Sequence, residues 1–480
     1  MKFKDYFKVA FATTFNIILN AATLGHYVWL EGRVRGGIFK NWAKRYGYRP
    51  KRFVQPTTEA EIIELVKSSK RLRLFGSGHS FNGGVLTDDV LVSLDRYSGV
   101  IWKDPAKKQM AVRAGTRVRD VVKALLDEGL AFAAQPSHDA QSMAGILSTD
   151  VHGTGRDWGF VSESVVKLKL IDGKGEIREC EPADDLFKAA VGGAGAVGII
   201  VEVVVQAVDR FNVAQNVELS DLSYVENNLE RLLQENDHFS LYLFPFTQKC
   251  QINTWNRTDR KRSFLGTVRE FVAISFDALL AAWFGNLVAY TGLLPRVSSL
   301  AHSLKKGTSL VLESGDAFNR TIYHLHQELE FTVPFEDTFE MCRRFIGLYE
   351  QMYATGLPYA IFEVRFTPAG HDRTLIGAGR KHRSTWIDLV LNDSDGFANY
   401  YAAAEELIKK IGARPHLGKY CESLDRSDLE RLHGEHFDRF RQLMEVQDPA
   451  GKFANDFTRR LFSSEARPAE VKDKGVGQAA

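Results

Sequence analysis

The sequence predicts an α+β fold with two domains. Between Arg49 and Ala207, short strand-like segments and tight turns surround one or two helices, without the regular alternation of a doubly wound fold. Between Asp209 and Arg414, four alternating apolar segments indicate one antiparallel sheet with helices on a face. The chain has 480 residues, 44% of them hydrophobic and 25% charged, which is enough for two or three globular domains.

The overall charge argues against a nucleic-acid-binding protein that relies on a basic surface. There are 62 Lys and Arg residues against 60 Asp and Glu, so the formal net charge is only +2. No general field therefore recruits nucleic acid. The four cysteines are too far apart for a metal knuckle or a disulfide framework, so we expect separate core thiols and no metal. They are Cys180, Cys250, Cys342 and Cys421.

Residues 1–40 are predicted to form an N-terminal apolar helix. No charged side chain occurs from Val9 to Leu30, and Lys2, Lys4 and Lys8 precede this run. The run is long enough to span a membrane, but its Thr and Asn residues lower its apolarity. We therefore expect a helix that lies on a membrane or on the protein itself, with a span as the less favoured alternative. The positive flank places the chain on the cytoplasmic side, with membrane association through this segment.

A second uncharged stretch lies inside the chain, from Ala278 to Pro295, and predicts a pair of helices. One apolar face of this pair is expected to pack on a domain core. The alternative is a lobe that touches a membrane beside an active site.

Residues 41–208 are predicted to form the first domain. Residues 59–68 have helical spacing, and Thr116 is a candidate N-cap for a second helix that ends at Gly129. Two glycines, Gly173 and Gly175, mark a hairpin turn. The expected strands are 71–75, 90–94, 109–114, 165–171 and 176–180.

Residues 209–424 are predicted to form the second domain, residues 425–462 a helical segment that returns to the first, and residues 463–480 a disordered tail. The four expected strands of the second domain are 240–246, 322–333, 360–366 and 385–391.

Three glycine-rich loops in the first domain are candidates for binding phosphate groups, because glycine lets backbone N–H groups approach a ligand closely. They are residues 76–81, 144–155 and 192–198. The third contains the Gly-x-Gly-x-x-Gly pattern, but a β-branched run at 199–205 follows it instead of a helix, which excludes a Rossmann site. No P-loop motif occurs. Several separated loops instead suit a dinucleotide that lies between two subdomains.

Six segments together resemble the vanillyl-alcohol-oxidase superfamily of flavoproteins, and within it the aldonolactone oxidases and alditol oxidases. The resemblance extends in order from Trp42 to Phe462. It implies an FAD-binding domain of the PCMH type, built from two α+β subdomains, and a cap domain over the flavin ring. The segments are 71–81, 137–155, 192–205, 363–365, 414–419 and 448–462.

The resemblance assigns cofactor-binding positions. His79 matches the histidine that bonds covalently to the flavin's eight-alpha methyl group; the alternative is a histidine that only hydrogen-bonds the cofactor or a carbonyl. Ile200 matches a position on the adenine side, and Pro136 one that faces the oxygen-reactive carbon. The other matched FAD positions are Gly76, Ser77, Gly78, Ser80, Phe81, Ser137, Ser142, Gly145, Thr149, His152 and Gly153.

Three residues are candidates for catalysis. Glu363 and Arg365 are two apart on an expected strand, so both project from one face. In the family, the matching Glu holds substrate hydroxyls and the matching Arg lies near the flavin's pyrimidine carbonyl, where it stabilises negative charge. Lys419 matches the lysine over the flavin. A lowered pKa in a dry pocket would let it assist removal of the hydroxyl proton; alternatively it stabilises the alkoxide.

Two departures from the family leave the exact sugar open. The segment 385–391 has Asp388 as its only ionisable group, where alditol oxidases place a histidine on the matching strand. Phe246 stands where lactone oxidases often carry histidine.

The resemblance implies an FAD-dependent oxidase that acts on the CH–OH group of a sugar lactone or alditol. Hydride passes to the flavin and then to oxygen, which gives hydrogen peroxide. One alternative is a membrane-associated flavin dehydrogenase of a lipid-linked sugar or apolar alcohol, with an electron acceptor other than oxygen. A second is a non-catalytic module that binds FAD or a nucleotide.

Overall fold

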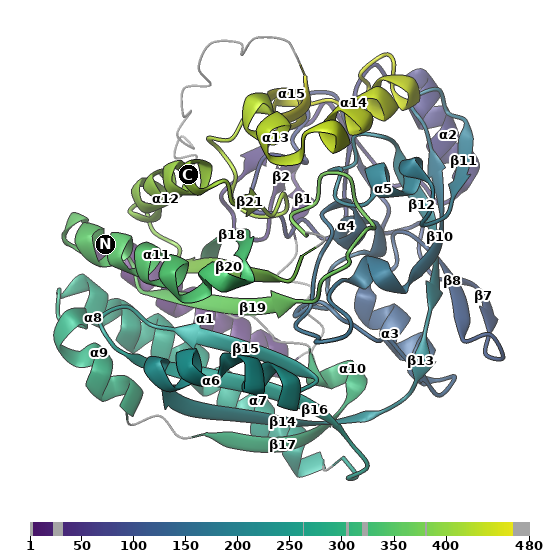
Figure 1. The fold of residues 1–480 in the computed structure, drawn as a ribbon. Helices are drawn as coiled ribbons and strands as arrows, with labels where there is room; N and C mark the ends of the chain where they lie inside the picture. The colour runs from purple at the N-terminus through teal and green to yellow at the C-terminus, as the bar shows by residue number, and fades with distance from the viewer. Residues whose placement is uncertain are drawn as a thin grey trace.

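The computed structural model describes residues 3–22, 32–262, 264–303, 307–318, 325–379 and 382–463. Helices and sheets of both parallel and antiparallel kinds occur in it, which confirms the α+β prediction. Figure 1 shows a first domain, in purple to blue, beside a sheet-rich second domain in teal and green, the cap domain.

The first domain contains a three-stranded parallel sheet and a five-stranded antiparallel sheet. The strands of the parallel sheet lie in the order β4 (Arg52–Val54), β6 (Val90–Ser93) and β5 (Leu72–Phe75). Helix α2 (Glu59–Ser68) begins at its N-cap Thr58, whose side chain accepts a hydrogen bond from the Glu61 amide. Both the helix and the expected strands are therefore confirmed, and the loop that leaves β5 carries the first glycine motif.

The larger sheet of this domain is antiparallel, and helices pack on it. Its strands are β11 (Ile177–Cys180), β10 (Val165–Ile171), β12 (Ile199–Gln206), β8 (Gln109–Arg113) and β7 (Val100–Asp104), and its helices are α3 (Val118–Leu126), α4 (Met143–Ser148) and α5 (Asp185–Ala190). Smaller strands are β1 (Arg33–Arg35), β2 (Ile38–Lys40), β3 (Gly47–Tyr48), β9 (Leu130–Ala131) and β13 (Val208–Asp209). The β10–β11 hairpin turns at the predicted glycines, and Gly175 has a φ of +79°.

The predicted role of Thr116 is wrong. Helix α3 has Arg117 at its N-cap, and no side chain caps it there. The Thr116 hydroxyl instead donates to the Arg113 carbonyl at 2.6 Å and accepts from the Gly99 amide at 2.8 Å. The threonine therefore fixes the turn after β8, because its hydroxyl bonds to backbone groups of β8 and of the loop before β7 instead of to the first turn of the helix.

The cap domain is built on an eight-stranded sheet in which each pair of neighbours is antiparallel. From edge to edge its strands are β17 (Thr308–Glu313), β14 (Asn212–Asp221), β16 (Lys249–Thr258), β15 (His238–Leu243), β19 (Ala360–Thr367), β20 (Ser384–Asn392), β18 (His326–Pro334) and β21 (Arg414–Pro415). The four predicted strands are β15, β19, β20 and β18, which are neighbours in this sheet; residues 322–324 of the predicted segment 322–333 lie outside the described residues.

The two faces of the cap sheet differ in polarity. Phe362, Val364 and Phe366 of β19 belong to an apolar core that they share with the helices α6 (Leu222–Glu235), α11 (Thr338–Met352) and α12 (Phe397–Ile411). Glu363 and Arg365 point to the other face, which lies against the first domain. The short helices α10 (Ser314–Ala317), η3 (Phe335–Asp337) and η4 (Tyr353–Thr355) belong to the cap domain, and η1 (Val161–Ser164) precedes β10 in the first domain.

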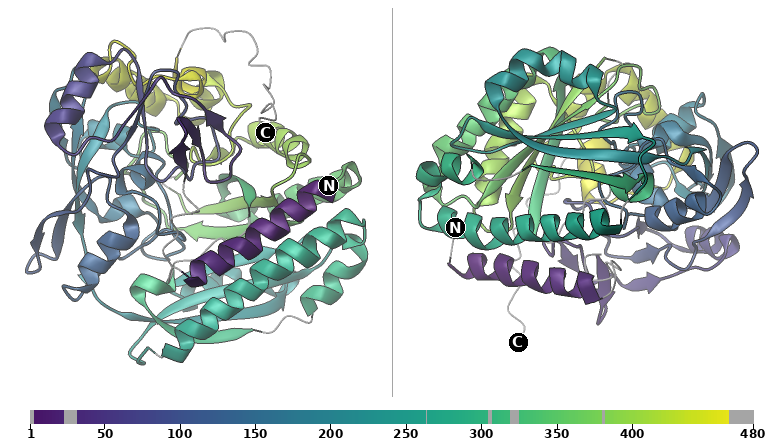
Figure 2. Two further views of the ribbon diagram at one scale, coloured as in Figure 1. Left: turned by 180° about the vertical axis from the view of Figure 1, so that it is seen from behind. Right: turned by 90° about the horizontal axis from the view of Figure 1, so that it is seen from below.

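The N-terminal helix α1 (Phe3–Ala22) lies along a helical run of the cap domain (Figure 2). This run consists of α7 (Phe264–Leu279), the π-helical η2 (Leu280–Gly285), α8 (Asn286–Tyr290) and α9 (Leu294–Ser303). The predicted helix pair at 278–295 is instead mostly the end of one continuous run through α7, η2 and α8, and a turn at Gly292 leads into α9. Tyr6, Phe7 and Phe11 contact the Trp283 ring, and the Trp283 indole donates to Thr14 at 2.9 Å. Among the described residues, no helix has the length and apolarity to cross a membrane.

The C-terminal helices complete the first domain. They are α13 (Arg426–His433), α14 (Glu435–Gln447) and α15 (Asp456–Phe462). Leu429, Phe440 and Leu461 are buried in the same core as the strands β10 and β12. The segment therefore packs into the core of the first domain, and the predicted disordered tail lies outside the described residues from 464 onward.

Candidate active site

A cavity lies between the first domain and the polar face of the cap sheet. All three catalytic candidates, Glu363, Arg365 and Lys419, line it. All the predicted cofactor positions except Gly153 line it as well: Gly76, Ser77, Gly78, His79, Ser80, Phe81, Ser137, Ser142, Gly145, Thr149, His152 and Ile200. Segments far apart in sequence are thus brought to one site.

The first glycine loop needs its glycines for close approach. At Gly76, a Cβ atom would overlap the Ser142 hydroxyl, so glycine lets this loop touch the start of α4. Gly78 has a φ of +65°, and a Cβ there would lie 2.7 Å from the Gly32 Cα. A side chain at either position would therefore separate backbone segments that form the cavity wall.

Arg73, on the strand that leads into the first glycine loop, binds the third glycine loop. Its guanidinium is buried and donates to the carbonyls of Phe453 at 2.7 Å and Ala194 at 2.9 Å, and also to that of Gly84. Ala194 belongs to the third glycine loop, which enters β12 as a strand. This local structure confirms that the loop is not a Rossmann turn.

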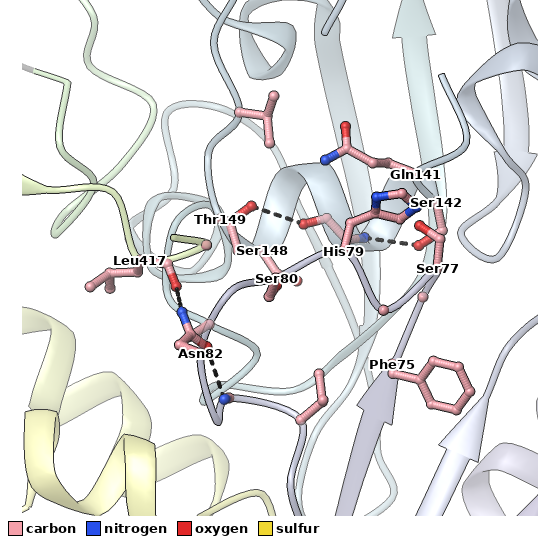
Figure 3. A pocket seen from close by; sticks show the side chains of 18 of the residues that line it. Phe75, Ser77, His79, Ser80, Asn82, Gln141, Ser142, Ser148, Thr149 and Leu417 are labelled. Atoms are coloured by element: carbon pink, nitrogen blue, oxygen red, sulfur yellow. Dashed lines mark hydrogen bonds between the residues drawn. The ribbon is translucent and has the colours of Figure 1, made fainter. Parts of the chain in front are cut away.

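Asn82 joins the first glycine loop to the segment that carries Lys419. Its side-chain amide donates to the carbonyls of Leu417 at 2.6 Å and Lys419 at 2.8 Å, and its oxygen accepts from the Gly84 amide. Figure 3 shows Asn82 pointing toward Leu417. This contact fixes the backbone of a catalytic candidate against the cofactor loop.

His79 carries an unsatisfied polar atom at the cavity. Its Nε2 atom is buried and has no hydrogen-bond partner among the described residues. The ring lies 5.8 Å from that of Trp42, nearly parallel to it, and 4.4 Å from that of His138. Burial, with help from His138 and Arg117, holds the pKa of His79 well below its usual value. The imidazole is therefore neutral near pH 7, and this nitrogen fits a bond to a group that enters the cavity.

His152 connects the cofactor side to the cap domain. Its Nε2 lies 3.0 Å from Glu330 Oε1, and its ring stacks on Trp386 with centroids 3.7 Å apart. Gly153 does not line the cavity; its amide donates to the Gly159 carbonyl at 2.7 Å. The sequence motif placed this glycine near the ligand, but here it shapes the turn behind His152.

Glu363 and Arg365 form a buried ion pair on β19, at 2.6 Å. Because the pair is buried, it differs from an exposed surface ion pair, which contributes little to stability. Although burial opposes its charge, Glu363 and Glu330 raise the pKa of Arg365, so the guanidinium stays a cation. A permanent positive charge therefore faces the cavity beside a carboxylate that accepts hydrogen bonds.

Lys419 is surrounded by carboxylates. Its ammonium group donates to Glu328 and lies 3.4 Å from Asp388 and 3.7 Å from Glu330. Burial alone would lower the pKa of Lys419, but the attraction of the three carboxyl groups raises it. The expectation of a lowered pKa is therefore wrong, since burial is outweighed by opposite charge.

Glu328 and Glu330 both line the cavity and were not predicted from the sequence. They alternate on β18 and face the same way as Glu363. Burial raises their pKa values, but the attraction of Lys419 for Glu328, and of His152 and Lys419 for Glu330, outweighs it and lowers both. Their spacing of two on an apolar strand was the one available signal. Charged residues on a strand with hydrophobic neighbours indicate a polar face that is covered by another domain.

The site combines a cradle of glycine loops, a neutral histidine, two cations and several carboxylates. Carboxylates hold hydroxyl groups, and cations stabilise negative charge that develops during reaction. Among the residues that the structure describes, no group of three or more His, Cys, Asp or Glu side chains is arranged to hold a metal ion. The chemistry suits a polyhydroxylated substrate beside an extended cofactor.

Comparison with known families agrees with both halves of the site. Residues 50–181 match an FAD binding domain, and residues 203–461 match the D-arabinono-1,4-lactone oxidase family. The second match covers more than half of the chain and includes all three catalytic candidates.

Curated relatives match along nearly their whole length. An L-gulono-1,4-lactone dehydrogenase of Mycobacterium tuberculosis is 27% identical, with 88% of this chain and 99% of the relative covered. An L-gulonolactone oxidase of Mus musculus is also 27% identical, over 89% of this chain and 99% of the relative.

Solved structures show the same fold. A cholesterol oxidase from Brevibacterium sterolicum superimposes with a TM-score of 0.71, covering 90% of this chain and 97% of that chain at 15% identity. With the family match over 203–461 and the FAD-binding match over 50–181, the chain belongs to the D-arabinono-1,4-lactone oxidase family of FAD-dependent oxidoreductases.

Proposed function

We propose that this enzyme oxidises a CH–OH group of a sugar lactone, or of a related alditol, and passes the electrons to oxygen with release of hydrogen peroxide. The observation that carries the proposal is the buried pair Glu363 and Arg365 on the cavity face of the cap sheet. The names of the relatives, which are lactone oxidases and a lactone dehydrogenase, support the substrate class.

Each charged residue has a role in this proposal. Glu363 accepts hydrogen bonds from substrate hydroxyls and so orients the ring. Arg365 supplies a fixed positive charge, and Lys419, charged at neutral pH, stabilises the substrate oxygen as its proton leaves. Because the groups are held by surrounding side chains, they need little rearrangement during reaction.

The residues present fit FAD. The glycine loops give the backbone close access, and the unpartnered His79 Nε2 accommodates a bond at the flavin's eight-alpha methyl group. FAD, when bound, supplies the acceptor for the two electrons of the substrate. We propose that His79 holds it covalently.

The covalent bond is tested by acid precipitation of the purified protein, followed by washing. Wild type should keep the yellow colour in the pellet, whereas His79→Ala should release FAD to the supernatant. The matched control His138→Ala, which changes the neighbouring ring, should keep the colour. Release of FAD from wild type would remove the covalent bond from the proposal and leave the family assignment intact.

The substrate class is tested with a panel of lactones and alditols. Glu363→Gln keeps the size of the side chain but removes the charge, so kcat/KM should fall by about 10²–10³-fold for any substrate of the panel. Glu340→Gln, an exposed change on α11, is the matched control. A hydrogen peroxide yield near one per turnover supports oxygen as the acceptor; a low yield with fast dye reduction favours the dehydrogenase alternative.

We also propose that the enzyme lies on a membrane surface, on its cytoplasmic side, through the helices α1, α7 and η2. Their outer faces carry large apolar side chains at helical spacing, each at least 44% exposed. A patch of this kind on a soluble surface is unusual, and aromatic residues suit the lipid interface. The side chains are Phe11, Phe15, Ile18, Val272, Phe276 and Leu280.

Co-sedimentation with phosphatidylcholine vesicles tests this surface. Wild type should pellet with the vesicles, and a Val272→Ser, Phe276→Ser double variant should remain in solution. Val446→Ser, which changes an equally exposed apolar residue on α14, is the control. If wild type stays in solution and elutes as a dimer that the double variant abolishes, the surface binds a second copy and the membrane proposal is wrong.

A further inference from the structure

A row of polar side chains crosses five strands of the cap sheet. Glu330 on β18 lies opposite Asp388 on β20, which lies opposite Glu363 on β19. The row continues to Tyr242 on β15 and Gln251 on β16. Opposite residues in antiparallel strands project from the same face, so the whole row points toward the first domain.

Carboxyl groups outnumber cations in this part of the cavity. Glu328, Glu330, Glu363 and Asp388 stand against Arg365 and Lys419. Both cations already have carboxylate partners: Arg365 binds Glu363, and Lys419 binds Glu328. Even with Asp388 protonated, since burial and Glu328 raise its pKa, the group carries a net negative charge.

The same groups retain capacity for a ligand. Arg365 Nε and Asp388 Oδ1 are both buried, and neither has a hydrogen-bond partner among the described residues. Buried polar atoms of this kind are rare without an unseen partner. Hydroxyl groups suit them, because a hydroxyl both donates and accepts.

We propose that the four carboxyl groups Glu328, Glu330, Glu363 and Asp388 form a charge filter, which admits the neutral lactone and rejects the ring-opened aldonate of the same sugar. The inference rests on the proposed function and specifies it further. A lactone and its hydrolysis product carry nearly the same hydroxyl groups and differ by one negative charge. Shape alone therefore separates them poorly, whereas charge separates them well.

The physical reason lies in the pairing of the cations. An incoming carboxylate would approach Arg365 or Lys419 beside Glu363 or Glu328, which already neutralise these cations. It would either bring a further negative charge against these buried carboxylates or displace one of them from its counter-charge, and both are costly. Neutral hydroxyls instead bind the carboxylates as donors and leave both ion pairs in place.

Glu328 is the position at which the filter can be relaxed. It lines the cavity and has His326 behind it, with 2.9 Å between His326 Nε2 and Glu328 Oε1. It is not needed to hold Arg365, which pairs with Glu363. Removing its charge therefore lowers the negative charge of the cavity and frees Lys419 to meet an anion.

The test compares two ligands on the intact holoenzyme without oxygen. Binding of an aldonate and of the matching neutral 1,4-anhydroalditol is followed by tryptophan fluorescence. In wild type the aldonate should bind at least 30-fold more weakly. Glu328→Gln should reduce the ratio of the two dissociation constants, aldonate over anhydroalditol, about tenfold, while Glu340→Gln should leave this ratio unchanged.

Two results would overturn the filter. Equal affinity of wild type for both ligands is one, and this comparison needs no variant to fold. An unchanged ratio in a flavin-loaded Glu328→Gln protein is the other. In both cases turnover of a lactone still supports the proposed function, whereas absence of binding and turnover with every neutral lactone and polyol means that the proposed function itself has failed.

Discussion

The charge state of Lys419 decides which proton transfer it can perform. Three carboxyl groups lie within 3.7 Å of its ammonium group, and together they raise its pKa. A lysine that stays protonated does not act as a base near neutral pH. In the proposed reaction, its contribution is a positive charge beside the reacting oxygen.

This assignment predicts a pH profile. Between pH 7 and 10 the kcat of wild type should show no rise from deprotonation of Lys419, because the raised pKa keeps the group charged throughout. Lys419→Met should lower kcat by about 10²-fold at every pH in this range, as expected for loss of an electrostatic contact. A wild-type profile that climbs tenfold per pH unit, and becomes flat in Lys419→Met, would instead identify the lysine as the base.

A second titrating residue, His371, joins the loop after β19 to the first domain. Its Nε2 lies 2.9 Å from Asp150, its Nδ1 lies 3.4 Å from Glu163, and its ring stacks on Phe160. Burial opposes the charge of the imidazolium, but Asp150 and Glu163 raise the pKa of His371 to about 9. The imidazole of His371 therefore binds its proton more tightly in the folded protein than in the unfolded chain.

Stability should therefore depend on pH through this histidine. The contribution, about 3 kcal/mol for such a shift, is fully present below pH ~6.5 and is lost as the pH rises through about 9. The difference in melting temperature between wild type and His371→Gln should shrink from pH 6 to pH 9.5. The exposed His436→Gln serves as a control. A difference that is constant with pH would show that His371 acts by packing alone.

Some site residues were accessible from sequence and others were not. His79 follows a Gly-x-Gly loop, and Glu363 and Arg365 share the two-residue period of a strand, so both patterns are local. Glu328 has one local signal, its spacing of two from Glu330, but its pairing with Lys419, 91 residues further along the chain, became recognisable only when β18 was placed beside β21. A pairing at that separation leaves no trace in the local sequence pattern.

At the scale of elements, the alternation of apolar and polar residues along a segment decided which strands could be predicted. β15, β18, β19 and β20 have an apolar face toward the helices of the cap domain and were found. β14, β16, β17 and the two-residue β21 were missed. β14 and β16 are rich in Asn, Gln and other polar residues; β14 is only partly covered, whereas in β16 the polar Gln251 and Asn253 are themselves buried. The cap sheet was therefore predicted at half its width.

Asn455 joins two elements that are distant in sequence. Its side-chain oxygen caps α15 by accepting from the Thr458 amide, and its amide donates to the carbonyls of Gly83, Gly84 and Leu86. The cap fixes the helix, and the amide fixes the loop beyond the first glycine motif. The oxygen atom of the side-chain amide has the first function and its nitrogen atom the second.

Replacement of Asn455 by aspartate separates these functions. Asn455→Asp keeps a good N-cap but turns three donor contacts into repulsion between oxygens, so unfolding free energy should fall by about 2–4 kcal/mol. Asn455→Ser, a cap without the long amide, should cost less because it adds no charge. Denaturant titration measures both. If the aspartate variant proves as stable as wild type, the loop contacts contribute nothing and only the cap matters.

At the scale of the whole molecule, the cavity wall is shared by both domains. Gly76 and Ile200 come from the first, Glu330 and Arg365 from the second, and His152 crosses between them through Glu330. A ligand that fills the cavity contacts both domains and should stabilise them together.

Flavin should therefore raise the stability of both domains in one transition. Apo His79→Ala, titrated with FAD to about 100 times its dissociation constant, should gain about 2.7 kcal/mol. Calorimetry should show a single peak that moves upward with FAD concentration. If only one of two separate peaks moves, the domains unfold independently and the cavity does not couple them.

The return of α13, α14 and α15 to the first domain has a consequence for biosynthesis. Phe440, Leu461 and Phe462 fill the core beneath β10 and β12, and Asn455 holds the loop beside the flavin cradle. A ribosome must therefore deliver the chain as far as Phe462 before the cradle can close. Until then, the emerging first domain exposes an unfilled core that is prone to aggregate. Binding of the cofactor thus has to follow synthesis of the C-terminal helices, which makes flavin incorporation a check that these helices have docked.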